Sequence, residues 1–420
     1  MDKLVIEGGR PLKGEVKISG SKNATLPILA ATLLTDDECV IHNVPKLRDT
    51  LTMIKLLRSL GKNANLEGDT ITVSSKGAIS HVADYKLVST MRGSFCVLGP
   101  LLAKLHHAKV SLPGGCVIGV RPVDLHIKGI QALGAKTEVE GGYVIAKADK
   151  LKGAQIYLAG GLGSSVLATA NVMMAAVLAQ GQTVIESASC EPEIEELANF
   201  LNEMGAKVQG QGSPRIIING VKRLYGAEFR IGSDRIEAGT FMILAAALRN
   251  SITLRNVPFA QLMALVDKLQ EAGVTIEEKG NAVKVNCKKH LKPTSVTTYP
   301  HPGFPTDLQA QFMTLMAMTP GVSIITDKVF PDRFIHIAEM NRMGANIRRE
   351  GISAVIEGVN VLFGAPVMAS DLRASAALVI AGLAARGKTE IHRIYHLERG
   401  YEEMDEKLKS LGAKVYREKE

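Results

Sequence analysis

Residues 123–134 read Val-Asp-Leu-His-Ile-Lys-Gly-Ile-Gln-Ala-Leu-Gly, an amphipathic segment that ends in an apolar residue followed by glycine. Its apolar side chains recur at steps of three and four residues, which predicts a half-exposed helix that stops at the glycine. An apolar residue and glycine recur in this way six times along the chain, at intervals of 68–73 residues, which indicates an internal repeat. The six pairs are Leu60-Gly61, Leu133-Gly134, Met204-Gly205, Ala272-Gly273, Met343-Gly344 and Leu411-Gly412.

Each repeat contains two further elements. A short β-branched run before each amphipathic helix predicts a strand, and an apolar segment with few charges beyond its first turn predicts a buried helix before that strand. The predicted strands are residues 39–41, 109–111, 183–185, 251–253, 322–324 and 389–391. The predicted buried helices are residues 21–34, 90–104, 164–180, 233–249, 306–318 and 370–386. We therefore expect an α/β protein with helices inside and sheets outside.

The N-terminal residues resemble a strand that other repeats carry after the amphipathic helix. Residues 12–18 are similar to residues 151–157 and 224–230, whereas the last repeat ends near Tyr416 without such a strand. We therefore expect residues 1–20 to fold with the C-terminal part of the chain and to complete the sixth repeat.

This arrangement predicts two domains of three repeats each. One domain comprises residues 21–231, and the other comprises residues 1–20 plus 232–420. The chain then crosses between the domains near Gly20 and near Gly232. Two close crossings are typical of a hinge, so we expect an active site in a cleft between the domains that closes on substrate.

The composition excludes some classes of protein. The 420 residues are 46% hydrophobic, without a signal-peptide core or an apolar run long enough to span a membrane. Five scattered cysteines, an odd number without a Cys-x-x-Cys pair, favour reduced thiols, a cytoplasmic protein and no zinc site. The formal charge of +8 suits either nucleic acid or small anions. The lack of tryptophan and of a long Lys/Arg run weighs against nucleic acid.

The sequence around Cys116 is typical of a loop with a reactive thiol. A Gly-Gly pair precedes Cys116 and leaves its sulfur unshielded. Arg121 follows five residues later, and a nearby cation favours thiolate over thiol. Pro122 and Asp124 then open the next predicted helix. The loop therefore indicates either a cysteine that faces an anionic substrate or an inert cysteine in a flexible segment.

Several charged residues lie at the starts of the predicted buried helices. Lys22, Arg92 and Arg373 occupy first turns, where the helix already carries about half a positive charge. Repeat symmetry would point these helix ends the same way, which predicts a site for anions, whereas separate exposure to solvent is the alternative. Asp307 follows a proline-rich lead-in at another such start, either as a reactive acid or as an ordinary first-turn acid. Arg121, Arg333 and Arg399 share one position in the repeat.

Together these motifs resemble the family of UDP-N-acetylglucosamine 1-carboxyvinyltransferases, along essentially the whole chain. The matching pieces are Ser21-Lys22-Asn23, Met91-Arg92-Gly93, the loop from Cys116 to His126, Gly303-Phe304-Pro305-Thr306-Asp307-Leu308-Gln309, Asp371-Leu372-Arg373 and Arg399-Gly400-Tyr401. The resemblance implies the enolpyruvyl transferase fold, a two-domain inside-out α/β barrel of six repeats. It also implies transfer of the enolpyruvyl group from phosphoenolpyruvate to the 3-hydroxyl of UDP-N-acetylglucosamine, the first committed step of peptidoglycan synthesis.

The resemblance also implies a role for each matching residue. Cys116 matches the general acid that can form an adduct with phosphoenolpyruvate and that fosfomycin alkylates, and Asp307 matches the acceptor of the sugar hydroxyl proton. The phosphoenolpyruvate-binding positions are Lys22, Asn23, Arg121, Arg333, Arg373 and Arg399, of which Lys22 and Arg399 also count as catalytic. The positions that bind UDP-N-acetylglucosamine are Arg92, Arg121, Pro122, Val123, Asp124, Leu125, Gly163, Ser164, Ser165, Val166, Asp307 and Val329. Leu167 and Glu398 depart from the family pattern, in which Gly and Asp are common there.

The residues also suit this chemistry without the family name. Adding a sugar hydroxyl to an enol ether needs one acid and one base on the two sides of the substrate. Phosphate is the leaving group, so cations can stabilise the departing charge, and neither a metal nor a cofactor is needed. Planar arginines bind carboxylate and phosphate through two hydrogen bonds at once.

Three alternatives remain at this point. A 5-enolpyruvylshikimate-3-phosphate synthase shares the fold and the chemistry but lacks the cysteine loop. A nucleic-acid-binding or RNA-end-processing repeat protein would bind RNA in a salt-sensitive way and would have no use for Asp307. An inactive scaffold would have no need of the complete set of charged residues.

Overall fold

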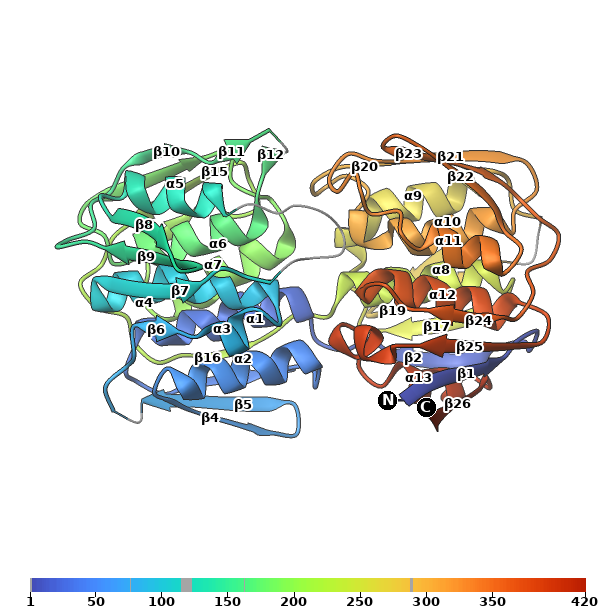
Figure 1. The fold of residues 1–420 in the computed structure, drawn as a ribbon, viewed down its shortest axis with the longest axis horizontal. Helices are drawn as coiled ribbons and strands as arrows, with labels where there is room; N and C mark the ends of the chain where they lie inside the picture. The colour runs from blue at the N-terminus through green and yellow to red at the C-terminus, as the bar shows by residue number, and fades with distance from the viewer. Residues whose placement is uncertain (1, 76, 115–122, 162, 288–289) are drawn as a thin grey trace. The chain divides into compact units, whose positions relative to one another are not determined.

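The computed structural model describes residues 2–75, 77–114, 123–161, 163–287 and 290–420. The described residues form two compact units (Figure 1). Residues 20–114 and 123–232 form the first unit, and residues 2–19 and 233–420 form the second unit. The chain passes from the second unit to the first between Ser19 and Gly20, and it returns between Gly232 and Ser233.

The first unit contains three four-stranded sheets of one design among its described residues. In each sheet the first two strands are parallel and the other pairs are antiparallel. The first sheet is β16 (Glu228–Arg230), β3 (Cys39–His42), β5 (Thr70–Ser75) and β4 (Lys62–Glu67). The second is β6 (Val82–Ala83), β7 (His107–Ser111), β9 (Tyr143–Lys147) and β8 (Lys136–Glu140). The third is β10 (Gln155–Tyr157), β13 (Gln182–Glu186), β15 (Arg215–Asn219) and β14 (Val208–Gln209).

The second unit contains three sheets of the same design. The first is β2 (Lys13–Lys17), β17 (Ser251–Arg255), β19 (Ala282–Asn286) and β18 (Thr275–Lys279). The second is β20 (Val296–Thr298), β21 (Val322–Asp327), β23 (Ser353–Glu357) and β22 (Asn346–Glu350). The third is β24 (Pro366–Met368), β25 (Lys388–His392), β1 (Asp2–Glu7) and β26 (Lys414–Lys419).

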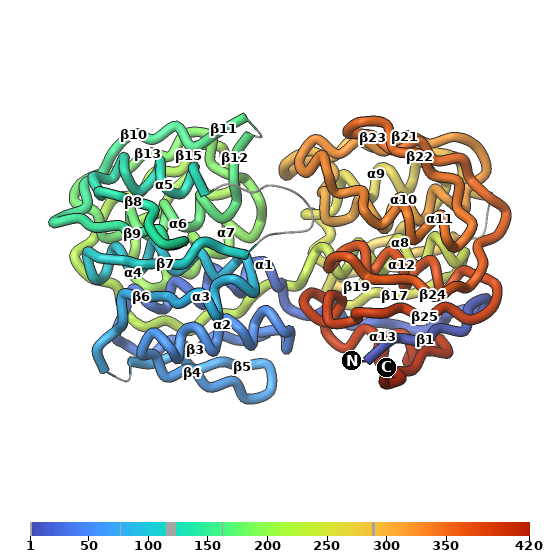
Figure 2. Tube along the Cα trace, viewed as in Figure 1, coloured from blue at the N-terminus to red at the C-terminus, as the bar shows by residue number. Residues whose placement is uncertain are grey.

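The N-terminal residues contribute to two different sheets of the second unit. Strand β1 lies between β25 and β26, with Leu4 opposite both Ile391 and Arg417, so it supplies the strand that the sixth repeat lacks. The two chain termini therefore lie close together (Figure 2). Strand β2 does not belong to that sheet, because it pairs in parallel with β17. Residues 12–18 therefore resemble residues 151–157 and 224–230 because all three segments contain the strand that pairs in parallel in its sheet.

One buried helix and one half-exposed helix accompany each sheet. The buried helices are α1 (Lys22–Ala31), α4 (Leu98–Leu105), α6 (Val166–Ala176), α8 (Arg235–Ala247), α10 (Gln309–Ala317) and α12 (Leu372–Ala384). The half-exposed helices are α2 (Arg48–Ser59), α5 (Asp124–Ala132), α7 (Pro192–Glu203), α9 (Met263–Glu271), α11 (Ile337–Arg342) and α13 (Met404–Ser410). The six predicted stop glycines all adopt a positive φ of 91–102°, a conformation that glycine reaches without strain.

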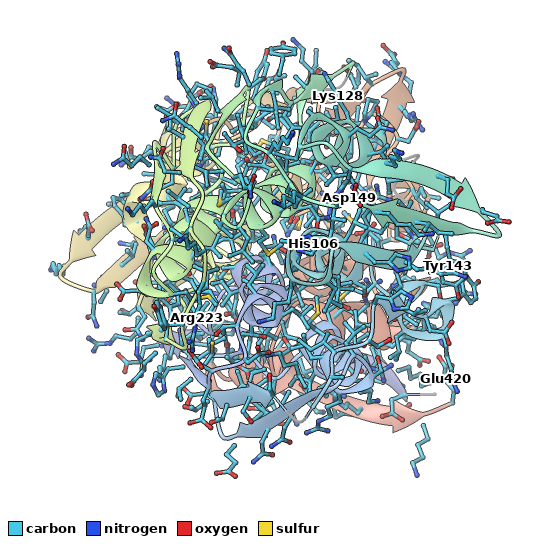
Figure 3. All side chains as sticks on the ribbon, turned by 90° about the vertical axis from the view of Figure 1, so that its left-hand side faces the viewer. His106, Lys128, Tyr143, Asp149, Arg223 and Glu420 are labelled. Carbon is cyan, nitrogen blue, oxygen red and sulfur yellow. The ribbon has the colours of Figure 1, made fainter. Side chains whose placement is uncertain are left out.

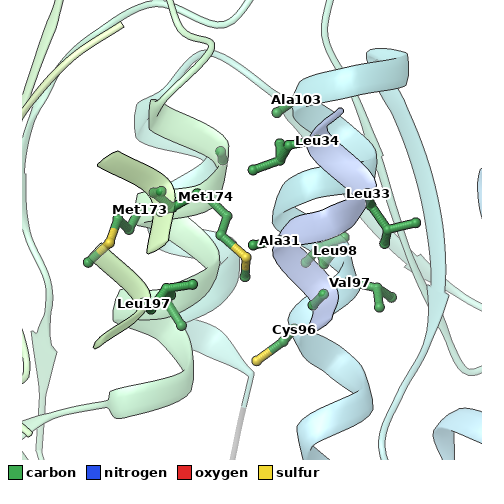
Figure 4. Packing of buried hydrophobic residues seen from close by; sticks show 14 of the residues in the cluster. Ala31, Leu33, Leu34, Cys96, Val97, Leu98, Ala103, Met173, Met174 and Leu197 are labelled. Carbon is green, nitrogen blue, oxygen red and sulfur yellow. The ribbon is translucent and has the colours of Figure 1, made fainter. Parts of the chain in front are cut away.

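Each unit has its own hydrophobic core, built around its buried helices. In the first unit, small and flexible apolar side chains fill the space between helices, and Met174 of α6 points towards Ala31 of α1 (Figure 4). Protein interiors are as densely packed as organic crystals, so this core holds the first turns of its helices in fixed positions. Those first turns carry the predicted site residues.

Two buried helices begin differently from the prediction. Thr90 does not open a helix, because its hydroxyl donates to the Leu87 carbonyl of the short helix α3 (Tyr85–Val88). The following helix starts instead as the 3-10 turn η2 (Arg92–Val97). The fifth buried helix likewise begins with a 3-10 turn, η4 (Thr306–Leu308), directly after Pro305.

Candidate active site

In the second unit, Asp307 lies between two arginines. Its Oδ1 accepts from Nη1 of Arg333 at 2.6 Å, and its Oδ2 accepts from Nη2 of Arg373 at 3.1 Å. Arg333 is 5% exposed and Arg373 is wholly buried, whereas a quarter of the Asp307 side chain remains exposed. Two guanidinium groups favour the charged form of a carboxylate, and they also fix its orientation. Such a carboxylate can accept a proton from a substrate that reaches its exposed edge.

A network of hydrogen bonds from the loop after β21 holds Arg333 in place. Asp327 ends β21 and accepts from the hydroxyl of Thr306 at 2.7 Å and from the backbone N–H groups of Val329 and Phe330 at 3.0 and 2.8 Å. Thr306 in turn accepts from Nη1 of Arg333 at 3.2 Å. Asp327 thereby ties the turn that carries Asp307 to the loop that carries Arg333, and it places the half-buried Val329 beside them.

Arg373 lies in the first turn of α12, a position that is unfavourable for a cation because of the helix dipole. The N-cap Asp371 offsets this cost by accepting from the backbone N–H groups of Arg373 and Ala374. The guanidinium carbon lies 5.3 Å from the ring centre of Tyr401. Burial lowers the pKa of Arg373, but the interactions with Tyr401 and Asp307 outweigh it and raise the pKa overall, so the cation is permanent.

Arg373 also has N–H donors that no acceptor of the described residues uses. Among the described residues, its Nε and Nη1 atoms have no acceptor although both are buried. A buried donor without a partner costs about 1–3 kcal/mol. This cost would be removed by an anion that brought two oxygens to the guanidinium group, which is how arginine commonly binds carboxylate and phosphate.

Arg399 lies at the end of the 3-10 turn η5 (Ile394–Arg399) and is half-buried. Its charge acts on His396, whose pKa is lowered by burial and then by the nearby Arg399 and Arg393, against the opposing effect of Asp371. The second unit thus brings Asp307, Arg333 and Arg373 into direct contact, and it adds a further cation on a neighbouring turn.

In the first unit, Lys22 forms an ion pair with Asp49. The Nζ atom of Lys22 lies 3.0 Å from Oδ2 of Asp49, and both side chains are nearly buried. Ser21 caps α1 by accepting from the Ala24 N–H, so Lys22 occupies the first helical position and Asn23 follows it half-buried. Lys22 was predicted to bind an anion, and the structure gives it an acidic partner that the sequence interpretation did not pair with it.

The surroundings of Arg92 contain a buried histidine. The side-chain oxygen Oδ1 of Asn171 accepts from the Gly99 N–H. Its side-chain nitrogen Nδ2 therefore donates to the Phe95 carbonyl at 2.9 Å and to Nδ1 of His126 at 2.8 Å. Burial, together with the charge of Arg92, lowers the pKa of His126 to about 3. His126 is therefore neutral, and Nδ1 carries no proton because it accepts from Asn171.

The residues predicted to contact the nucleotide sugar surround the start of α6. Gly163 and Ser164 form β12, which pairs with β11 (Ala159–Gly160), and Ser165 caps α6 by accepting from the Ala168 N–H. A Cβ on Gly160 would lie 3.6 Å from the side chain of Leu125.

The β11–β12 hairpin therefore lies against the start of α5. Leu125, which follows Val123 and Asp124, therefore lies close to the hairpin that carries Gly163 and Ser164 and leads through Ser165 to Val166 of α6.

Cys116, Arg121 and Pro122 lie outside the described residues, so their predicted roles stay predictions. The other predicted site residues are divided between the two units. Sequence interpretation missed the supporting residues Thr306, Asp327 and Tyr401, and it did not pair Asp49 with Lys22. Thr306 and Tyr401 stand inside quoted motifs, but nothing in a motif says which distant side chain a residue contacts.

Other kinds of site are not visible in the described part of the chain. No three His, Cys, Asp or Glu side chains there gather as they would around a metal ion. None of its helices combines the length and the apolar character that crossing a bilayer requires. Charged side chains of both signs project from the face drawn in Figure 3, with Lys128 and Arg223 on the same unit as Asp149.

Comparison with known proteins places the chain in a family. The profile of the EPSP synthase (3-phosphoshikimate 1-carboxyvinyltransferase) family matches residues 6–408. The chain belongs to the EPSP synthase family. Within this family, the UDP-N-acetylglucosamine 1-carboxyvinyltransferase of Methylacidiphilum infernorum is 51% identical over 417 residues, which are 99% of each chain. The enzyme of the same name from Desulfatibacillum aliphaticivorans is 52% identical over 419 residues and the full length of both chains.

Solved structures of other proteins share the fold. The enolpyruvyl transferase NikO from Streptomyces tendae superimposes with a TM-score of 0.89 at 23% identity, covering 99% of this chain and 98% of its own. An EPSP synthase from Acinetobacter baumannii superimposes with a TM-score of 0.77 at 18% identity over both full lengths. The predicted enolpyruvyl transferase fold is therefore confirmed, and so is the resemblance to UDP-N-acetylglucosamine 1-carboxyvinyltransferases.

Proposed function

We propose that the protein transfers the enolpyruvyl group from phosphoenolpyruvate to the 3-hydroxyl of UDP-N-acetylglucosamine and releases phosphate. The observation that carries this proposal is full-length identity above 50% to enzymes named for that reaction. The carboxylate of Asp307, held between two buried guanidinium groups, supports it because the reaction needs an oriented base next to fixed cations.

In this proposal, Asp307 takes the proton of the 3-hydroxyl as that oxygen bonds to the substituted carbon of phosphoenolpyruvate. Cys116 gives a proton to the methylene carbon, so the addition product carries both substrates. The double bond then forms again when the Cys116 thiolate takes a proton back from the methyl group and the bond to phosphate breaks. Neither step changes the oxidation state, so the chain's own acid, base and cations are sufficient.

We assign the anionic groups of phosphoenolpyruvate to the predicted cations. Lys22 and Asn23 in the first unit, with Arg121, bind phosphoenolpyruvate together with Arg399, Arg333 and Arg373 in the second unit. The unpartnered Nε and Nη1 atoms of Arg373 support its part, because they can donate to two oxygens of one anion. We keep the prediction that both units act on one pair of substrates.

We assign UDP-N-acetylglucosamine to Arg92, to residues 121–125 and 163–166, and to Val329 and Asp307. The closeness of Gly160 to Leu125 supports this, because Gly160 pairs with Gly163 in the β11–β12 hairpin. The reaction would serve peptidoglycan synthesis, and the cytoplasmic location expected from the cysteines stays a prediction.

The competing proposal is a synthase that uses shikimate 3-phosphate, which the family name itself mentions. We favour UDP-N-acetylglucosamine because the Acinetobacter EPSP synthase is only 18% identical to this chain. The test is phosphate release by the purified protein from phosphoenolpyruvate with each acceptor in turn. We expect phosphate release when UDP-N-acetylglucosamine is the acceptor and none when shikimate 3-phosphate is the acceptor. Release with shikimate 3-phosphate alone would favour the competitor, and release with neither acceptor would refute both.

A further inference from the structure

Three buried polar side chains adjoin Asp307 and Arg373. Thr240 of α8 and Gln311 of α10 are fully buried, and Tyr401, which follows η5, is 2% exposed. The hydroxyl oxygens of Thr240 and Tyr401 are 2.9 Å apart. Nε2 of Gln311 lies 3.0 Å from the Tyr401 hydroxyl and 2.9 Å from the main-chain carbonyl of Asp307. Three separate elements of the second unit therefore meet at one small polar cluster.

The direction of each hydrogen bond in this cluster follows from its partners. The Thr240 hydroxyl lies 2.8 Å from the carbonyl of Ile236, which can only accept, so Thr240 donates there. Tyr401 must then donate to Thr240, because the only hydrogen of Thr240 is already used. Gln311 in turn donates one hydrogen to the Asp307 carbonyl and the other to the hydroxyl oxygens of Tyr401 and Thr240, which lie 3.0 and 3.1 Å from its Nε2.

This assignment leaves one atom of the cluster without a partner. Oε1 of Gln311 is buried and has no donor among the described residues. If the amide were flipped, Oε1 would replace Nε2 beside the Asp307 carbonyl, which can only accept. The only hydrogen that it could then receive is that of a hydroxyl group. The orientation of the Gln311 amide is therefore set by its donors, at the expense of its acceptor.

The cluster supports both the backbone and the side chain of Asp307. Gln311 holds the main-chain carbonyl of Asp307. The ring of Tyr401 lies under the guanidinium group of Arg373, which holds the carboxylate of Asp307. Tyr401 thus belongs to a closed path that leads from its hydroxyl through Gln311 to the Asp307 backbone, and from its ring through Arg373 to the Asp307 side chain.

We propose that Tyr401 and Gln311 are positioning residues, which set the direction of the Asp307 carboxylate through its backbone and through Arg373. Tyr401 acts as a neutral phenol and takes no part as an acid or a base, because the cluster needs its hydroxyl as a donor. Burial raises the pKa of Tyr401 despite the opposing charge of Arg373, which agrees with this role. The inference rests on the proposed function.

The test compares Tyr401→Phe with wild type by steady-state phosphate release. The variant keeps the ring beneath Arg373 and loses only the hydroxyl. We expect kcat to fall at least tenfold, because small errors in the geometry of a catalytic group are costly. We expect KM for both substrates to stay within twofold. The acid limb of the pH–rate profile should move to higher pH, because the Tyr401 hydroxyl also interacts with Arg373 and its loss leaves this cation less firmly held beside the carboxylate.

A purely structural role predicts a different result. Tyr401→Phe would then melt at a lower temperature, but the folded enzyme would keep the kcat and the pH profile of wild type. That outcome would refute the inference. Thr240→Val provides a second test should Tyr401→Phe not fold, because it removes the hydroxyl that accepts the Tyr401 proton and keeps the shape of the side chain. A loss of kcat at unchanged KM is expected there too, and an unchanged kcat would refute the inference.

Gln311→Met has a matched control on the same helix. Gln309 is equally buried, and neither of its amide atoms has a partner among the described residues. We expect Gln311→Met to lower kcat at least tenfold and Gln309→Met to leave it within twofold. Equal effects of the two substitutions would contradict the positioning role. Wild-type protein inactive with both acceptors would instead refute the proposed function, which separates that failure from failure of the inference.

Discussion

Nη2 of Arg373 donates to Oδ2 of Asp307 at 3.1 Å, although 66 residues separate the two in the chain. The arginine is wholly buried, and the carboxylate is partly exposed. The buried guanidinium group of Arg373 thus holds the Asp307 carboxylate in place while the exposed part of that carboxylate stays accessible to a substrate. This pairing unites two motifs that the sequence presents as unrelated helix starts, and it is the main structural support for Asp307 as the base.

Replacing Asp307 by Asn should lower kcat by about 10²–10⁴-fold, the usual contribution of a positioned base. It should also lower the melting temperature, because Arg333 and Arg373 would lose their shared counter-charge. Asp405→Asn is the matched control, since Asp405 forms a two-point ion pair with Arg417 in the same unit. The control should be destabilised but keep kcat within twofold. Turnover by Asp307→Asn at the wild-type rate would mean that another group is the base.

The ion pair of Lys22 with Asp49 should contribute to stability, because both side chains are nearly buried. We expect Asp49→Asn to lower the free energy of unfolding by about 3 kcal/mol, since it removes the negative charge beside a nearly buried ammonium group. Asp36→Asn breaks the more exposed pair with Lys104 and should cost less than about 1 kcal/mol. Urea denaturation measures both values. Equal small effects would show that Lys22 does not depend on Asp49.

The local features of the fold could be predicted from the sequence. The stop glycines and the apolar helices depend on near neighbours, and Gly134 and Gly205 have the positive φ that their positions require. Long-range pairings could not be predicted in the same way. The repeats predicted that residues 1–20 complete the sixth repeat, but they did not predict which strand pairs where: β1 pairs with β25, whereas β2 pairs with β17 of the fourth repeat.

The candidate site shows the same division. Its charged residues stand in motifs at helix starts, so the sequence indicated them one by one. Their partners depend on the packing of whole helices, as in the bonds from Gln311 of α10 to Tyr401 and to the Asp307 carbonyl. Thr90 was placed wrongly for a related reason, because the preceding turn uses its hydroxyl as part of α3 rather than as a helix cap.

His126 should make the stability of the protein depend on pH. Its pKa is about 3 in the folded state, against about 6.5 for an unperturbed histidine. Below pH 6.5 the unfolded chain takes up a proton that the folded chain refuses, so stability falls as the pH drops from there towards 3. Between pH 8 and 5 the loss is about 2 kcal/mol.

His126→Asn isolates this contribution, because an Asn oxygen can accept from Asn171 in place of Nδ1. Urea midpoints should therefore fall less steeply with decreasing pH in the variant than in wild type. Parallel curves for the two proteins would mean that His126 is not held neutral.

Cys116 should be the cysteine that reacts with the epoxide fosfomycin. Thiolate is the reactive form, and burial raises the pKa of Cys39, Cys190 and Cys287, and raises that of Cys96 to about 12. Peptide mass mapping after incubation should find the adduct on Cys116. Labelling should survive in Cys190→Ser and disappear in Cys116→Ser. An adduct on Cys190 or Cys96 would contradict the assignment.

The most direct measurement is a crystal structure of the protein with UDP-N-acetylglucosamine and an unreactive analogue of phosphoenolpyruvate. We expect the sugar 3-hydroxyl within hydrogen-bond distance of the Asp307 carboxylate, roughly 2.6–3.2 Å, and the sulfur of Cys116 on the far side of the analogue. A sugar hydroxyl remote from Asp307, in a complex with both ligands bound, would contradict the account.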